Sequence, residues 1–278
     1  MYKKALRLIL VVLLLSVLSC STFSPFMRNR NYSTLPLVFD KGNTTVVIVS
    51  LRDEKMRSFV LSLFKDVDEF IKRSDYLTVA FLGDGTITGA FEGYYPIDGV
   101  RLASGKNTID YSGFNVYSPD GGIVAFTTGD VKDSKELMFE NRTEKAMSTD
   151  IEKYYAYPLS IYGPPTEAFN LWFASLLGFD KTYMDFNKID ISFSFAENLS
   201  NISNEIGLLV NGSLDFDKGE DATKFARGIK ASLVGQYRQK RLSFDVKMLD
   251  KKLAQTNSHL DFFGFPYYFS YNLLEYQE

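Results

Sequence analysis

The chain has 278 residues and a nearly balanced charge, with 31 Lys and Arg against 34 Asp and Glu. Hydrophobic residues make up 45% and aromatic residues 15% of it, which excludes a disordered chain and implies a packed, strand-rich fold. The basic residues are not clustered, and the single histidine and single cysteine are too few for histidine-based catalysis or a zinc site, so we expect no nucleic-acid partner and no metal.

The first element is an apolar segment that ends at the single cysteine. A basic start precedes the apolar run 8–18, which has the length and order of a secretory signal and is short for a membrane span. The residues Val17-Leu18-Ser19-Cys20 resemble the lipobox of bacterial lipoproteins. This resemblance implies a signal peptide 1–19 that is cleaved before Cys20, and acylation of Cys20. Plain secretion and an uncleaved anchor are the alternatives.

The lipid attachment that the resemblance implies would hold the protein on a bacterial membrane. Several acyl chains make such attachment effectively permanent, whereas one chain is reversible. Ser21, in place of an aspartate, favours the outer membrane under the sorting pattern of lipoproteins. Residues 20–34 are polar and lack periodicity, so we expect the lipidated cysteine to be followed by a flexible tether.

Residues 35–150 are expected to form an α+β lobe. The β-branched run Val46–Val49 predicts a central strand over 44–51, buried on both faces of a sheet. Residues 53–73 place apolar side chains at helical spacing, which predicts an amphipathic helix that packs on the sheet. Two hairpins should follow, the first formed by strands 76–82 and 86–94 around Gly83-Asp84-Gly85 and the second by strands 114–117 and 123–128.

The stretch 130–165, which ends in Gly163-Pro164-Pro165, is the expected boundary before a second α+β lobe over 151–278. The expected elements of that lobe are a helix over 166–177, strands over 188–195 and 205–216, a helix over 221–234 and a strand over 241–248. The predicted fold class is α+β, with mainly antiparallel twisted sheets and two or three amphipathic helices on one face. It is expected either as two similar lobes or as a single domain with one larger sheet.

One acidic segment, Asp215–Asp221, is the best candidate for a calcium site. It begins with an Asp-x-Asp spacing, but Glu220 and Ala226 stand where an EF-hand needs a glycine and a bidentate glutamate. A turn between a strand and a helix that Asp221 caps is the favoured interpretation. We therefore expect neither a metal nor a cofactor.

Aromatic residues are the best candidates for a binding site. Tyr154, Tyr155 and Tyr157 lie close together in the sequence, and Trp172 belongs to a segment that is apolar around most of its circumference. Packing in the core would explain these residues as well. The predicted function is a non-catalytic, membrane-anchored envelope lipoprotein that binds a partner. The alternatives are a carrier or sensor of a hydrophobic ligand such as a lipid, and a carboxylate-dependent hydrolase.

Overall fold

The computed structural model describes residues 43–63, 68–93, 109–111, 113–120, 123–134, 153–179, 183–196, 205–239 and 245–270. The predicted signal peptide 1–19, Cys20 and the tether to residue 34 lie outside the described residues. All described residues belong to one compact unit, Thr34–Glu278.

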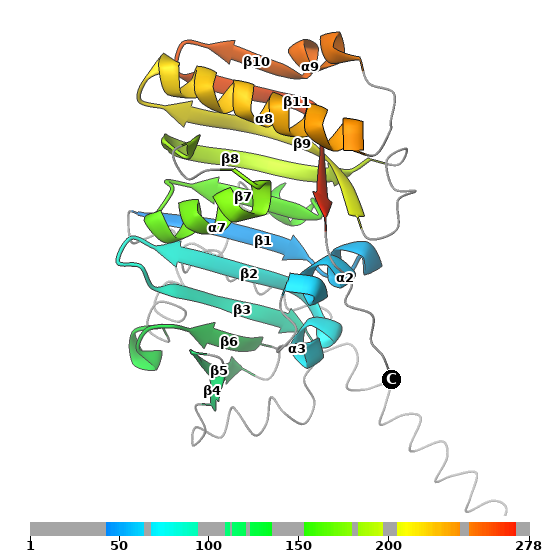
Figure 1. Cartoon of the computed structure of the whole chain (residues 1–278). Helices are drawn as coiled ribbons and strands as arrows, with labels where there is room; N and C mark the ends of the chain where they lie inside the picture. The colour runs from blue at the N-terminus through cyan, green and yellow to red at the C-terminus, as the bar shows by residue number, and fades with distance from the viewer. Residues whose placement is uncertain are drawn as a thin grey trace, which may run out of the picture. The chain divides into compact units, whose positions relative to one another are not determined.

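A sheet of eleven strands forms this unit, and its neighbouring strands pair in antiparallel register (Figure 1). The strands lie in the order β10-β11-β9-β8-β7-β1-β2-β3-β6-β5-β4. Their bounds are β1 Thr44–Ser50, β2 Ser74–Leu82, β3 Ile87–Gly93, β4 Ile109–Tyr111, β5 Phe114–Asp120, β6 Ile123–Thr127, β7 Leu159–Gly163, β8 Phe186–Phe195, β9 Glu205–Phe216, β10 Leu253–Thr256 and β11 His259–Ser270.

Strand β1 lies at the middle of the sheet, between β2 and β7. Residues 44–49 are all buried, so both faces of β1 are covered, and β1 has a paired strand on each side. The predicted central strand is confirmed. Strand β7 lies within the expected boundary 130–165, and it pairs with β1 on one side and β8 on the other. The strands of the two predicted lobes, 35–150 and 151–278, therefore belong to one sheet.

The two predicted hairpins are confirmed. Strands β2 and β3 pair on either side of Gly83-Asp84-Gly85, where Gly85 has a φ of +86°, a value that side chains with a Cβ rarely adopt. The Asp84 carboxylate accepts a hydrogen bond from the backbone N–H of Thr86 at 2.9 Å, which closes the turn. Strands β5 and β6 form the second hairpin, with β5 extending to Asp120.

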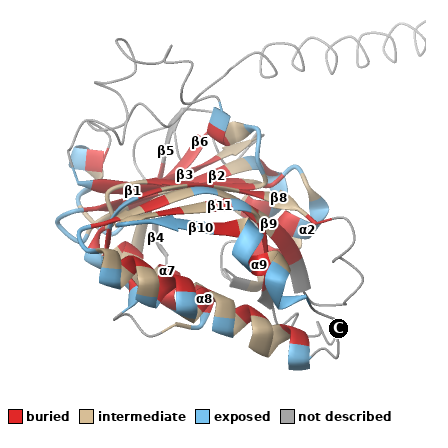
Figure 2. Ribbon diagram, turned by 90° about the horizontal axis from the view of Figure 1, so that it is seen from above, coloured by how far each residue is buried: buried red, intermediate tan, exposed pale blue. Residues whose placement is uncertain are grey.

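Five of the described helices contribute to one hydrophobic core on one face of the sheet. They are α2 Glu54–Leu63, α3 Asp68–Arg73, α7 Glu167–Leu177, α8 Gly219–Gln239 and α9 Val246–Lys252. Figure 2 shows α7 and α8 on the same side of the sheet, with their buried residues turned toward the strands. Buried side chains of all five helices join one apolar cluster with the strands. The α+β class with helices packed on an antiparallel sheet is confirmed.

Two predicted elements differ from the structure. The single helix expected over 53–73 is described as α2 and α3, with 64–67 outside the described residues. The strand expected over 241–248 is wrong at 246–248, which belong to the helix α9 over Val246–Lys252, and 241–244 lie outside the described residues. Asp245 caps α9 by accepting a hydrogen bond from the Lys247 N–H at 2.9 Å, and only one turn later does Leu249 reach the core. An alternation of four apolar residues is too short to exclude a helix.

Candidate binding surface

The exposure of the sheet face opposite these helices differs from one side of the sheet to the other. Over the middle strands it is closed, since Val46, Ile48, Ala80, Ala90 and Tyr162 are all no more than 3% exposed. The same face becomes accessible on β8, β9 and β11. We call this region the open strand face and define it by the residues that alternate onto it, namely Lys188, Asp190, Ser192, Asn211, Ser213, Asp215, His259, Asp261 and Phe263.

The register of the strands places these side chains side by side. Asp190 of β8 stands opposite Ser213 of β9, which in turn stands opposite Asp261 of β11. Antiparallel neighbours in direct register point to the same face, so the three strands present one continuous polar surface. Each of its side chains is half-buried or exposed. Such a strand face is wetted, as the sequence alternation in β8 predicts.

One large apolar side chain lies on this polar surface. Phe263 is 53% exposed and stands opposite Asn211. A β-bulge follows it, where Gly264 adopts a φ of +63° and donates its N–H to the Asn211 side-chain oxygen at 2.8 Å. Bulges redirect side chains and interrupt strand pairing, and they are frequent near functional sites. The bulge and the Asn211 hydrogen bond fix the backbone that carries Phe263.

The single histidine lies at the other end of the open strand face. Its Nδ1 contacts the Asp215 carboxylate, and its Nε2 lies 3.0 Å from Asp261 Oδ1. The hydrogen bond to Asp215, and the negative charge of Asp261 beside it, raise the pKa of His259 above its usual value. The two carboxylates approach different nitrogens of the ring. Among the described residues, no group of three His, Cys, Asp or Glu side chains could hold one metal ion.

The three predicted tyrosines lie in different environments. Tyr154 is buried and stacks on Tyr162 with ring centroids 4.1 Å apart, while Lys153 lies over its ring and reaches Asp190 at 3.6 Å. Tyr155 is half-buried and packs edge-on against a tyrosine of β2. Tyr157 is exposed. Packing therefore accounts for Tyr154, and Tyr157 is the one of the three that faces solvent most.

Trp172 lies on the opposite side of the sheet from these tyrosines. Thr166 caps the start of α7 by accepting a hydrogen bond from the Phe169 N–H at 3.2 Å, and Gly178 ends the helix with a φ of +67°. The indole of Trp172 is half-buried, 5.6 Å from the ring of Phe81 on β2. Leu171 beside it is 50% exposed. In the part of the chain that the structure describes, no helix has the length and apolar character needed to cross a membrane.

The aspartate carboxylates of the candidate calcium segment Asp215–Asp221 each contact a different partner. Asp215 contacts His259, Asp217 accepts a hydrogen bond from the Asn187 amide at 2.8 Å, and Asp221 pairs with Lys224 at 2.8 Å. Helix α8 begins at Gly219, so Asp221 lies inside its first turn and does not cap it. The expected turn between strand and helix is confirmed.

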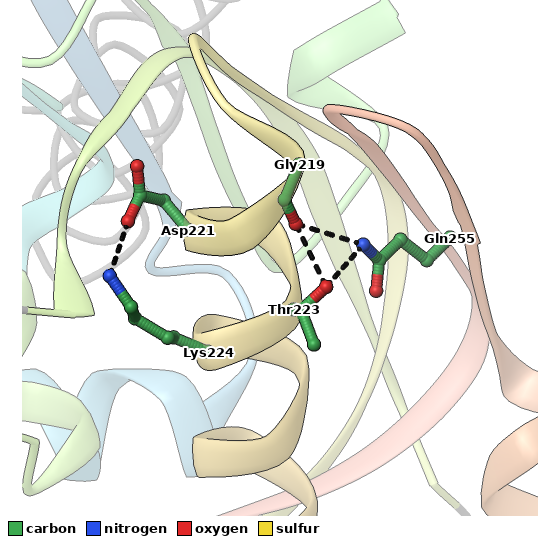
Figure 3. A network of polar contacts seen from close by, with 5 residues as sticks. All are labelled: Gly219, Asp221, Thr223, Lys224 and Gln255. Atoms are coloured by element: carbon green, nitrogen blue, oxygen red, sulfur yellow. Dashed lines mark hydrogen bonds and ion pairs between the residues drawn. The ribbon is translucent and has the colours of Figure 1, made fainter.

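The first turn of α8 is tied to the edge of the sheet instead (Figure 3). The Gln255 amide of β10 donates to the Gly219 carbonyl at 3.2 Å and to the Thr223 hydroxyl at 2.8 Å, and that hydroxyl donates to the same carbonyl at 2.8 Å. These hydrogen bonds hold the first turn of α8 on β10. They give this segment a structural role.

Sequence reasoning did not single out the open strand face. A signal was present, because His259, Asp261 and Phe263 alternate with the buried Leu260 and Phe262. That alternation predicts a strand with one wet face.

The fold and the open strand face together define an α+β protein with a helix-covered antiparallel sheet. Among solved structures, this fold is similar to that of TP0453. Crystal form I of TP0453 has 12% sequence identity and a TM-score of 0.54, over 86% of this chain and 94% of that chain. Crystal form III has 11% identity and a TM-score of 0.51, over 86% and 95% respectively. No family model and no curated protein matches the sequence. The likeness shows a shared fold.

Proposed function

We propose that the protein is an envelope lipoprotein, anchored through Cys20, whose folded unit binds a partner through the open strand face and catalyses no reaction itself. The observation that carries the proposal is the accessibility of this surface. The same face of the same sheet is closed over β1, β2, β3 and β7, yet on β8, β9 and β11 it presents polar side chains around Phe263.

The composition of the surface supports binding. Interfaces place an aromatic anchor among polar groups that form hydrogen bonds with the partner. Phe263 is such an anchor, and Asn211, Ser213 and Ser192 offer amide and hydroxyl groups around it. The surface lies on strands rather than on loops, so its side chains are held in fixed relative positions.

The Phe263→Ala variant should separate binding from stability. Because this side chain is 53% exposed, its loss should change the free energy of unfolding by no more than about 0.5 kcal/mol. Because Phe263 is the aromatic anchor of the proposed interface, its loss should weaken partner binding by about 2 kcal/mol, roughly 30-fold. The measurement is photo-crosslinking in native membranes by a chain with a photoreactive phenylalanine analogue in place of Phe263, and the Phe263→Ala chain should compete for the adduct roughly 30-fold less well than the wild-type chain.

Position 171 gives the matched control. Leu171 is 50% exposed and lies on a helix that packs on the opposite face of the sheet. The analogue at 263 should give an adduct of discrete mass, and the analogue at 171 should not. Adducts at 171 alone, or at neither position, would rule out the open strand face as the binding surface.

A second candidate function, the carriage of a hydrophobic ligand, is favoured by α7. Leu171 is half exposed, and Trp172, Leu176 and Phe179 are only partly buried against the core. Such a surface can take an apolar ligand.

Native mass spectrometry tests this alternative on the chain that begins at Ser21, purified without detergent. A discrete additional mass that organic solvent removes would place the carrier function first. Under the proposed function, the expected result is the mass of the protein alone.

A further inference from the structure

The imidazole of His259 is held between two carboxylates that belong to different parts of the sheet. Asp215 comes from β9, and Asp261 lies two residues along β11 from the histidine. All three side chains belong to the open strand face and are partly exposed, between 36% and 41%. His259 is the only histidine in the chain.

The two contacts of the His259 ring can both be hydrogen bonds only if the ring carries two protons. A neutral imidazole carries one N–H, whereas an imidazolium carries two, and an ionised carboxylate can only accept hydrogen bonds. Nδ1 faces Asp215 and Nε2 faces Asp261, so both contacts are hydrogen bonds only when His259 is protonated. After deprotonation, one ring nitrogen presents a lone pair to a carboxylate. That contact becomes repulsive and must open.

The closer of the two contacts is expected to persist. Nδ1 lies nearer to Asp215 than Nε2 does to Asp261, so we expect the remaining proton to stay on Nδ1 and the Asp261 contact to open. Lys188 of β8 stands opposite Asp215, and β10 places the uncharged Thr256 opposite His259. With His259 protonated, the charges of His259 and Lys188 balance those of the two aspartates. Loss of the proton leaves a net negative charge.

We propose that His259 is a proton-operated latch on the open strand face: protonated, it ties Asp215 to Asp261, and deprotonated, it releases Asp261 and adds a negative charge beside the binding surface. Regulation of partner binding by this latch rests on the proposed function. The latch itself is a property of the folded chain. Because the folded state binds the proton more tightly than a free imidazole does, the stabilisation is complete below pH about 6.5 and is lost as the pH rises through the folded midpoint.

Nuclear magnetic resonance can follow this latch directly, since the chain gives a single imidazole signal. The sample is the chain that starts at residue 20 and carries Cys20→Ala. We expect a titration midpoint above 6.5, with Nδ1 protonated in the neutral form and the Asp261 carboxyl resonance moving with the same midpoint. Asp215→Asn and Asp261→Asn should each lower the midpoint. Asp190→Asn, on the same face but away from the ring, should leave it unchanged.

Two further results decide the proposal. A midpoint at or below 6.5 that neither asparagine variant moves would overturn the latch, whatever the protein binds. Crosslinking from position 263 at pH values on either side of the midpoint tests the regulation. The yield should change with pH in the wild-type chain and stay constant in His259→Gln, and an equal pH response in both would overturn the regulatory role. No adduct at any pH, with a normal titration, would instead contradict the proposed function.

Discussion

Replacing Phe169 with alanine is expected to lower the free energy of unfolding by about 3–5 kcal/mol. The side chain is 0% exposed, and its ring lies between α7 and the sheet. Its centroid is 5.6 Å from that of Phe81, 5.2 Å from Phe173 and 6.4 Å from Phe186. Aromatic neighbours of this size cannot collapse into the space that the ring leaves, so a cavity remains. Urea denaturation monitored by circular dichroism measures the loss.

Leu171→Ala is the matched control, because it removes an aliphatic side chain two residues further along the same helix. That side chain is 50% exposed, so the expected change is within about 0.5 kcal/mol. Equal effects of the two substitutions would mean that α7 is not held on the sheet through Phe169. The comparison also bears on the carrier alternative, since a helix fixed by its buried face leaves only its outer residues available to a hydrophobic ligand.

Elements whose residues act locally could be predicted from the sequence. The β-branched run in β1 can be buried on two faces only at the middle of a sheet, and the structure places it there. Helix α7 begins and ends where Thr166 and Gly178 cap it. Asp84 and Gly85 form the expected hairpin turn. In each case, residues adjacent in the sequence determine the local structure.

The open strand face depends on pairing between distant residues, and this explains why it was not predicted. Asp215 and His259 are 44 positions apart in the sequence and meet only because β9 pairs with β11 in one register. A shift of one residue would turn His259, Asp261 and Phe263 toward the helices. The bulge at Gly264 changes this alternation once more. Local periodicity indicates a wet face, but it does not say which strands share it.

The Cys20→Ala variant should lose membrane attachment entirely. The lipobox resemblance of Val17–Cys20 implies that the cysteine carries the acyl chains, and alanine offers no sulfur to modify. Each buried methylene contributes about 0.8 kcal/mol to membrane binding, so two or more chains hold the protein where a single chain would exchange. Labelling with a radioactive fatty acid, followed by separation of membranes from soluble protein, measures both effects. We expect no label and a soluble protein.

Ser21→Ala gives the control for this experiment, since it changes the neighbouring residue and keeps the sulfur. That variant should be labelled and should remain with the membranes. An unlabelled Cys20→Ala chain that still sediments with the membranes would point to the apolar run 8–18 as an uncleaved anchor, and continued labelling would exclude Cys20 as the attachment site. If the protein is released as expected, crosslinking at position 263 should also fall, because the tether no longer concentrates the open strand face near a partner at the membrane.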